Sequence, residues 1–249
     1  MADLVESLLA VPSVVAVARL DGEVAGPLPR GGESVYLVYY RGSLASGQLQ
    51  GLGFEGDVSE PGTWGRLMNG GGSLTVEGRR VDLAYRDLDF VEHWVAEATE
   101  GRYEVDEVEG WLAGMATYVL VGELAIADTL AGELPRPEFP APLCETAPPR
   151  WQRTAARLLE VAERLATRGD VVGCTGLLAK AAVASAQSRL AERGEWRLSE
   201  TGIVRHTGLG RAEAVLAAPG DRPGDLERSV SRIRVALGVG SAAEPAGAR

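Results

Sequence analysis

Residues 35–40 read VYLVYY, an unbroken run of β-branched, aromatic and aliphatic side chains. Such residues favour β-strands and pack well within a sheet, so the run predicts a buried strand. Upstream, the apolar run VVAVARL at residues 14–20 predicts another buried strand. Downstream, Ser73–Val76 and Arg80–Tyr85 flank Glu77-Gly78, a pair that predicts a tight turn between two antiparallel strands. The first half of the chain is therefore predicted to contain a sheet.

Helical patterns alternate with these strands, and an aspartate just before such a pattern is typical of a helix N-cap. Residues 1–134 are therefore predicted to form an α/β (α+β) domain with a short mixed sheet. Its further predicted elements are a helix at Leu4–Ala10, a helix capped by Asp87 or Asp89 and ending near Thr99, an edge strand at Tyr103–Val108, and a helix at Tyr118–Leu130.

Proline is concentrated between the two halves of the chain. Six prolines fall within residues 135–149. Proline lacks a backbone N–H and its ring clashes with the preceding helical turn, so this density disfavours helices and central strands. Residues 135–149 are therefore predicted to be an interdomain linker.

The second half is rich in alanine, leucine and arginine at helical spacing. Pro149–Ala166 places its leucines on one face and its charged residues elsewhere, which is typical of an amphipathic helix. Residues 150–239 are predicted to form a C-terminal helical bundle, and residues 240–249 a disordered tail. The other helices predicted in the bundle are Val171–Arg193, Ala212–Ala217 and Leu226–Leu237.

The charge balance argues against nucleic acid as a partner. The chain has 25 basic and 35 acidic residues, a net charge of −10, and no basic stripe that would neutralise a run of phosphates. No apolar run of about 18 residues occurs, and no leader-like segment opens the chain. Cys144 and Cys174 match no metal or redox spacing. We therefore expect a soluble, cytoplasmic protein that binds neither nucleic acid nor membrane.

Several short segments together suggest a family. In chain order, they are Tyr39-Tyr40-Arg41-Gly42, Val58-Ser59-Glu60-Pro61-Gly62, Asn69-Gly70-Gly71, Arg80-Val81-Asp82-Leu83, Tyr85-Arg86-Asp87, Tyr118–Leu124, Arg168–Val171 and Glu195–Leu198. In this order, the segments resemble actinobacterial members of the nucleotidyltransferase superfamily, in its small two-domain form similar to aminoglycoside nucleotidyltransferases. The resemblance covers about Val14 to Ala217. No single segment is specific, and their common order carries the likeness.

The resemblance implies a site built from three elements. A Gly-Ser turn that opens a helix offers backbone N–H groups and a partial positive charge to a triphosphate. An Asp-x-Asp pair on the next strand, with a third aspartate on a neighbouring strand, holds two magnesium ions. These ions clamp the attacking and leaving oxygens at the α-phosphorus.

Two of these elements are altered in this sequence. The turn aligns with Gly22-Glu23, where a carboxylate replaces serine; two unit charges about 4 Å apart repel by about 4 kcal/mol at an effective dielectric constant of about 20. The Asp-x-Asp positions align with Glu33 and Val35, and the third aspartate with Asp82. Because valine cannot ligate magnesium, the resemblance predicts an eroded metal and triphosphate site. No metal or cofactor is therefore expected.

The carboxylates of the predicted site have alternative interpretations. Asp82 is either a surviving site residue or the partner of a nearby arginine such as Arg80. Glu33 is either a site residue or an ordinary loop carboxylate beside glycines. Glu200 is either an acid, base or acceptor-binding group facing the cleft, or a solvated surface residue.

Three functions fit these observations. The first is a pseudoenzyme that binds a small molecule or partner in an interdomain cleft. The second is a repurposed enzyme of a specialised-metabolite pathway, in which Glu23, Glu33, Asp82 or Glu200 act as acid and base. The third is a working nucleotidyltransferase that modifies a small-molecule hydroxyl, with magnesium and a nucleoside triphosphate held by rebuilt carboxylates. The first is preferred, and whether any catalysis remains is left open.

Overall fold

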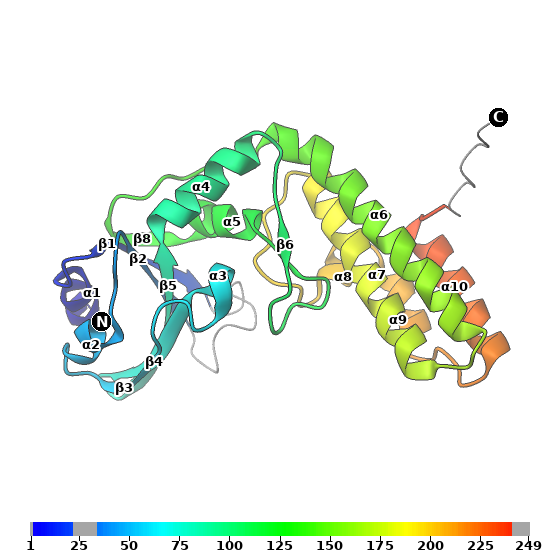
Figure 1. Cartoon of the computed structure of the whole chain (residues 1–249), viewed down its shortest axis with the longest axis horizontal. Coiled ribbons are helices and arrows are strands. Elements are labelled where there is room, and N and C mark those ends of the chain that lie inside the picture. Colours follow the sequence, from blue (N-terminus) through cyan, green and yellow to red (C-terminus); the bar gives the residue numbers. More distant parts are fainter. Residues whose placement is uncertain (1, 22–33, 241–249) are drawn as a thin grey trace. The chain divides into compact units, whose positions relative to one another are not determined.

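The computed structural model describes residues 2–21 and 34–240, and its element order is shown in Figure 1. The chain divides into two compact units. Unit 1 comprises Met1–Pro142 and Trp196–Ser199, and unit 2 comprises Leu143–Glu195 and Glu200–Arg249. The short segment Trp196–Ser199 thus leaves the helical half of the sequence and packs within unit 1, where the Trp196 ring lies 4.4 Å from that of Phe139.

Unit 1 is built on a six-stranded mixed sheet with the strand order β3-β4-β5-β2-β1-β8. Strands β2 and β5 are parallel, and the other neighbouring pairs are antiparallel. The mixed α/β sheet followed by helices confirms the predicted fold class. The strands are β1 (Val14–Asp21), β2 (Ser34–Tyr40), β3 (Glu55–Val58), β4 (Gly70–Val76), β5 (Arg79–Asp87) and β8 (Asp128–Gly132).

The hairpin between β4 and β5 forms at the predicted turn. Glu77 and Gly78 both have positive φ angles, of 52° and 75°. Two central residues with positive φ are characteristic of the type I′ turn, whose twist matches that of the flanking strands. The turn thereby fixes the register of β4 against β5.

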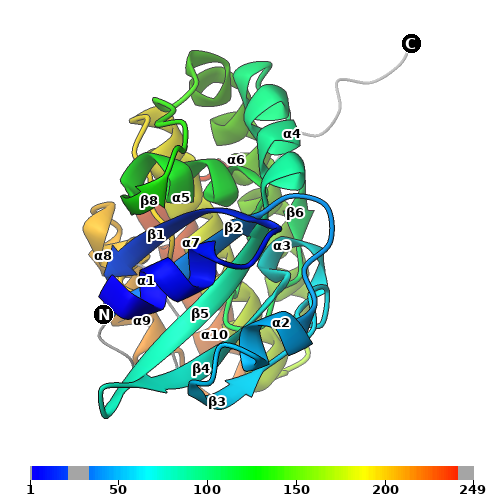
Figure 2. The same cartoon turned by 90° about the vertical axis from the view of Figure 1, so that its left-hand side faces the viewer.

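The two faces of the sheet are covered differently (Figures 1 and 2). Helices α1 (Ala2–Leu9) and α2 (Ser46–Gln50) cover one face, over a core that includes Leu4, Leu8, Tyr36, Val38 and Leu83. The other face carries the side chains that alternate with these along each strand. On that side lie α3 (Gly65–Met68), α4 (Leu88–Thr99) and α5 (Tyr118–Ile126).

The N-cap of α4 is Asp87, one of the two aspartates that the sequence offers for this position. Its carboxylate accepts hydrogen bonds from the backbone N–H groups of Asp89 and Phe90. These are donors that the helix itself leaves unsatisfied.

Two predicted elements of unit 1 are wrong. Residues 103–108 do not form an edge of the main sheet, because β6 (Val105–Asp106) pairs only with β7 (Met115–Ala116) in a separate two-stranded sheet. The predicted helix over residues 118–130 ends at Ile126, and Asp128–Gly132 forms edge strand β8 against β1. Pairing with a strand more than a hundred residues away leaves no trace in the local apolar spacing.

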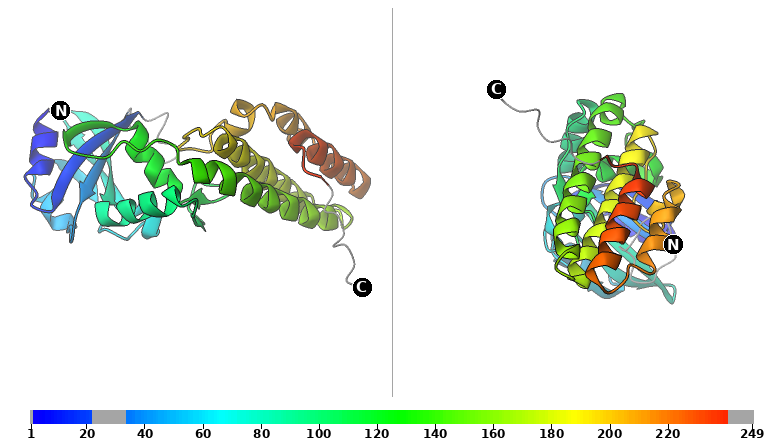
Figure 3. Two further views of the ribbon diagram at one scale, coloured as in Figure 1. Left: turned by 90° about the horizontal axis from the view of Figure 1, so that it is seen from above. Right: turned by 90° about the vertical axis from the view of Figure 1, so that its right-hand side faces the viewer.

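Unit 2 is helical, and Figure 3 shows its long helices side by side. The long helices α6, α7 and α10 overlap helices predicted for the second half. Trp151, Leu159, Leu178 and Ile233 are among their buried side chains. The helices are α6 (Ala141–Ala166, beginning just before the division between the units), α7 (Val171–Glu192), α8 (Ile203–His206), α9 (Gly210–Leu216) and α10 (Pro223–Leu237).

The proline-rich stretch is partly helical, contrary to the expectation that its prolines disfavour a helix. Helix α6 begins at Ala141 and continues through Pro148 and Pro149. Proline in a helix interior costs about 3 kcal/mol or more, so other contacts must stabilise this turn. The Ser188 hydroxyl of α7 donates a hydrogen bond to the Pro148 carbonyl (3.1 Å), and Trp151 is buried on the following turn. Tertiary packing therefore overrides the local preference.

Within residues 2–21 and 34–240, no helix has the length and apolar character needed to cross a bilayer.

Candidate functional site

A row of side chains crosses the sheet face opposite α1 and α2. Val35 on β2 is the register partner of Asp82 on β5, which in turn pairs with Ser73 on β4. Ser73 pairs with Asp57 on β3. Directly paired residues on neighbouring strands point to the same face, so these four side chains lie in one line across the sheet.

This row forms part of the wall of a cavity of about 600 Å³. The cavity is lined by unit 1 alone, and its lining combines hydroxyl, carboxylate and guanidinium groups with one indole. A volume of this size, and a few polar groups that can orient a ligand, are typical of a small-molecule site. The lining residues used below are Val35, Asp57, Ser59, Trp64, Gly71, Ser73, Thr75, Arg80 and Asp82.

Asp82 is the most buried carboxylate of the cavity, with 5% of its surface exposed. The Arg80 guanidinium donates to it, with Nε 3.1 Å from Oδ1. The two residues are separated by one position along β5, so their side chains leave the same face of the strand. The predicted pairing of Asp82 with Arg80 is thus present, and it places a cation against the carboxylate inside the cavity wall.

Trp64 projects into the cavity from the segment 59–69, which we call the Trp64 loop. Its indole is 39% exposed, although the loop is closely held. The Ser59 N–H donates to the Gly71 carbonyl (2.8 Å), and the Gly71 N–H donates to the Ser59 hydroxyl (3.1 Å). A Cβ atom built on Gly71 would overlap the Leu83 carbonyl oxygen and lie 2.6 Å from Cη2 of Trp64. Glycine at position 71 therefore makes room for the indole against the sheet.

Asn69 closes the Trp64 loop in a strained conformation. Its φ and ψ angles of 58° and −75° lie near the γ-turn region with positive φ, which is rare outside glycine. Its carbonyl accepts from the Trp64 N–H (3.0 Å), and its side-chain amide binds Gly62 N–H (2.8 Å) and the Tyr40 hydroxyl (2.9 Å). Such strain costs about 1–3 kcal/mol and is concentrated at functional sites.

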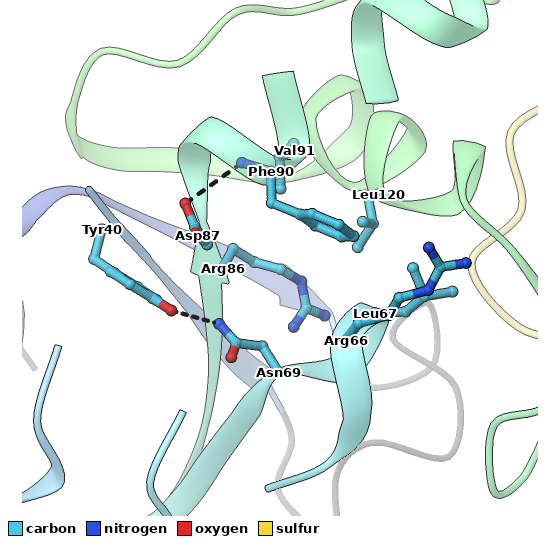
Figure 4. A pocket seen from close by; sticks show the side chains of 9 residues that line it. All are labelled: Tyr40, Arg66, Leu67, Asn69, Arg86, Asp87, Phe90, Val91 and Leu120. Carbon is cyan, nitrogen blue, oxygen red and sulfur yellow. Dashed lines mark hydrogen bonds between the residues drawn. The ribbon is translucent and has the colours of Figure 1, made fainter. Parts of the chain in front are cut away.

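Behind Asn69 lies a smaller cavity of about 140 Å³, with Tyr40, Asn69, Arg86 and Asp87 in its wall (Figure 4). The polar groups of these residues are engaged within the fold: Asp87 caps α4, and Tyr40 binds Asn69. We therefore place the candidate site in the larger cavity and regard the smaller one as part of its support.

A buried ion pair supports the same face of the sheet. Arg86 on β5 and Glu123 on α5 have side chains 1% and 3% exposed, and they form two hydrogen bonds, Nε to Oε2 (2.5 Å) and Nη2 to Oε1 (2.7 Å). The remaining guanidinium nitrogen, Nη1, donates to the carbonyls of Met68 (3.1 Å) and Tyr85 (2.8 Å). Burial alone lowers the pKa of Arg86, but the Glu123 carboxylate outweighs burial and the net pKa is raised.

Tyr39 lies beside this pair, and its hydroxyl has no hydrogen-bond partner in the described part of the chain. Burial raises the pKa of the Tyr39 hydroxyl; Glu123 raises it further, and Arg86 acts in the opposite direction. The hydroxyl is therefore held in its neutral form without a partner.

We expect Tyr39→Phe to leave the free energy of unfolding unchanged or raise it by up to about 1 kcal/mol, because an unpaired buried hydroxyl is costly. Tyr40→Phe is the matched control, since its hydroxyl accepts from Asn69 (2.9 Å) and its loss should cost about 1 kcal/mol. Urea denaturation of both variants measures the difference. A clear loss of stability in Tyr39→Phe would show that its hydroxyl is satisfied.

Only part of the predicted site can be placed. Asp82 lies in the cavity, whereas Gly22, Glu23 and Glu33 fall outside the described residues. Glu200 belongs to unit 2, just before α8, so the cavity in unit 1 is built without it. Within the described ranges, no three histidine, cysteine, aspartate or glutamate side chains are grouped to hold a metal ion.

Three features of the cavity were not singled out from the sequence: Asp57, Ser73 and the position of Trp64. One signal was available, because three consecutive glycines at residues 70–72 interrupt a strand pattern. Glycine inside a strand often marks a close approach of another backbone or side chain. Here, Gly71 faces Trp64 and Gly72 faces β3.

No protein-family profile matches the chain, and no curated protein matches it in sequence. Among solved structures, the chain is similar to a nucleotidyltransferase-like protein from Exiguobacterium sibiricum 255-15, with 11% sequence identity and a TM-score of 0.49. The match covers 96% of this chain and 75% of that one. A similarity of this degree establishes neither a family nor an activity, so function has to be inferred from the residues of the site.

Proposed function

We propose that this chain is a nucleotidyltransferase-like protein that does not perform two-metal nucleotidyl transfer and instead binds a small organic molecule in the cavity around Asp82. The observation that carries the proposal is the register of β2 and β5, in which Val35 is the direct partner of Asp82. The resemblance assigns metal-binding carboxylates to these two positions. Adjacent strands are about 4.8 Å apart, so a carboxylate at position 35 would stand beside Asp82 and share a metal ion with it.

The described side chains do not fit that metal centre. Val35 is 1% exposed and offers no ligand atom. Asp57, the other carboxylate of the row, lies two strands from Asp82, or about 10 Å at the usual strand spacing. Oxygen ligands of magnesium lie about 2.1 Å from the ion, so these two carboxylates are too far apart to share one. Arg80 already supplies Asp82 with a positive partner.

The cavity suits an organic ligand better than a triphosphate without metal ions. Ser73 and Thr75 donate and accept hydrogen bonds, Asp57 and Asp82 accept them, and Trp64 offers an apolar surface. Two carboxylates and one guanidinium leave the described lining with an excess negative charge. A triphosphate would be repelled by this lining unless metal ions neutralised it.

Calorimetric titration with ATP and GTP, with and without millimolar magnesium, tests the first half of the proposal. We expect no binding heat with either nucleotide. A double variant, Val35→Asp with Glu23→Ser, is the minimum change expected to restore magnesium-dependent affinity, provided that its thermal unfolding shows a folded protein. Magnesium-dependent binding in the micromolar range by the unchanged protein would contradict the proposal and support an active nucleotidyltransferase.

A thermal-shift screen of small organic molecules against the unchanged protein and Asp82→Asn tests the second half. Asp128→Asn is the matched control, because Asp128 also pairs with an arginine on a strand (Arg19, 3.3 Å) but lies outside the cavity. A ligand of the cavity should lose most of its stabilising effect in Asp82→Asn and keep it in Asp128→Asn. Ligands that stabilise all three proteins equally would place binding elsewhere.

A further inference from the structure

Trp64 is one of few large apolar side chains of the described residues that are left exposed, and it is the one that lines the cavity. Its six-membered ring lies against Gly71, on the side of the sheet that carries Asp82 and Ser73. An indole held in this way offers an aromatic surface beside hydrogen-bonding groups. We call Trp64 and the strand beneath it, Gly71–Ser73, the Trp64 shelf.

The shelf is held in place before any ligand arrives. Asn69 and Ser59 fix the two ends of the Trp64 loop through the hydrogen bonds described above, and Asn69 does so with a positive φ of 58°. Glu60, inside the loop, accepts hydrogen bonds from the backbone N–H (3.0 Å) and the hydroxyl of Ser46 on α2. These contacts fix an exposed indole in the wall of the cavity, which reduces the entropy lost when a ligand binds.

The charges around the shelf favour a positively charged ligand. Asp57 is exposed and has no ion-pair partner among the residues that the structure describes, whereas Asp82 is matched by Arg80. The cavity wall beside the shelf therefore includes one carboxylate, that of Asp57, which no described residue pairs with, in a protein with a net charge of −10. Positive charge is attracted both by a carboxylate and by the face of an indole ring.

We propose that the Trp64 shelf binds a planar organic cation, with the ligand ring against Trp64 and its positive charge near Asp57. This inference rests on the proposed function, because it takes the cavity around Asp82 as the ligand site. Stacking favours a flat ring and the Asp57 carboxylate favours a positive charge, so a ligand with both properties should bind better than one with either alone.

Three small probes separate the two requirements. 1-Methylnicotinamide is planar and cationic, nicotinamide is planar and neutral, and 1,1-dimethylpiperidinium is cationic but not planar. Each is titrated into ¹⁵N-labelled full-length protein, and binding is followed by the indole N–H signals in ¹H–¹⁵N spectra. The chain has five tryptophans, and Trp64→Phe assigns the Trp64 signal by its loss.

We expect 1-methylnicotinamide to shift the Trp64 indole signal saturably, with a Kd at least about fivefold lower than that of either other probe. Trp64→Ala should raise this Kd roughly tenfold, as for the loss of one stacked ring, whereas Trp64→Phe should retain most of the affinity. Asp57→Asn should weaken binding about fivefold and reduce its salt dependence. The ligand's own proton signals report binding in the variants that lack the Trp64 indole.

Several outcomes would overturn the inference. Equal affinity for nicotinamide would remove the role of charge, and equal affinity for 1,1-dimethylpiperidinium would remove the role of stacking. Unchanged binding in Trp64→Ala would place the site elsewhere. A ligand that depends on Asp82 but leaves the Trp64 signal unmoved would refute the shelf while supporting the cavity. Magnesium-dependent ATP binding would instead refute the proposed function.

Discussion

Replacing Arg86 by leucine is expected to lower the free energy of unfolding by about 3–5 kcal/mol. The change leaves the Glu123 carboxylate buried without a positive partner, and it also removes the donors to the carbonyls of Met68 and Tyr85. Glu123→Leu should be destabilising by a similar amount, because it leaves a buried guanidinium without its carboxylate. Guanidinium chloride denaturation, followed by circular dichroism, measures both effects.

The double variant Arg86→Leu with Glu123→Leu distinguishes two free-energy effects: the cost of leaving one buried charge without a partner, and the contribution of the ion pair to stability. We expect it to be more stable than either single variant, since two apolar side chains leave no buried charge unpaired. Arg41→Leu is the surface control: Arg41 pairs with Asp89 and Glu92, all of them largely exposed, and its loss should cost less than about 1 kcal/mol. Equal effects at Arg86 and Arg41 would contradict the role assigned to burial.

Gly71→Ala is expected to destabilise the protein by about 1–3 kcal/mol or more and to move Trp64. The added methyl group would overlap the Leu83 carbonyl and press on the Trp64 ring at 2.6 Å from Cη2. The backbone contact cannot relax without shifting β4 against β5. Thermal unfolding measures the loss, and the indole signal of Trp64 in ¹H–¹⁵N spectra reports the displacement.

Gly47→Ala provides the matched control for this substitution. Gly47 lies in α2, and a Cβ atom built on it meets nothing within 4 Å. Alanine there should be neutral or stabilising by up to about 1 kcal/mol, because it favours the helix. If Gly71→Ala were as harmless as Gly47→Ala, the close approach of Trp64 to β4 would be wrong.

The effects at Gly71 and Arg86 act on different parts of the site. Gly71 determines whether the indole has room to lie against β4, whereas Arg86 on β5 binds Glu123 on α5. Ligand binding at the Trp64 shelf should therefore be lost in a Gly71 variant that still folds. In an Arg86 variant, the main expected effect is instead a lower free energy of unfolding.

The sequence by itself determined the elements whose signals are local. Apolar runs identified β1 and β2, the Glu77-Gly78 pair identified the turn between β4 and β5, and the pair Asp87 and Asp89 identified the start of α4. The pairing of Asp82 with Arg80 could also be predicted from the sequence, because residues two apart in a strand share a face. These features depend on backbone angles and side-chain period, which neighbouring residues set.

Only the tertiary structure decided what surrounds those elements. The line from Val35 through Asp82 and Ser73 to Asp57 joins four strands, and the Arg86–Glu123 pair joins a strand to a helix 37 residues away. The same holds for β8 at the sheet edge and for the prolines inside α6. Strand register and burial depend on contacts between distant segments, and these contacts can override local preferences. For this reason the sequence predicted an altered metal and triphosphate site that includes Asp82, whereas only the tertiary structure shows that Trp64 and Asp57 line the same cavity as Asp82.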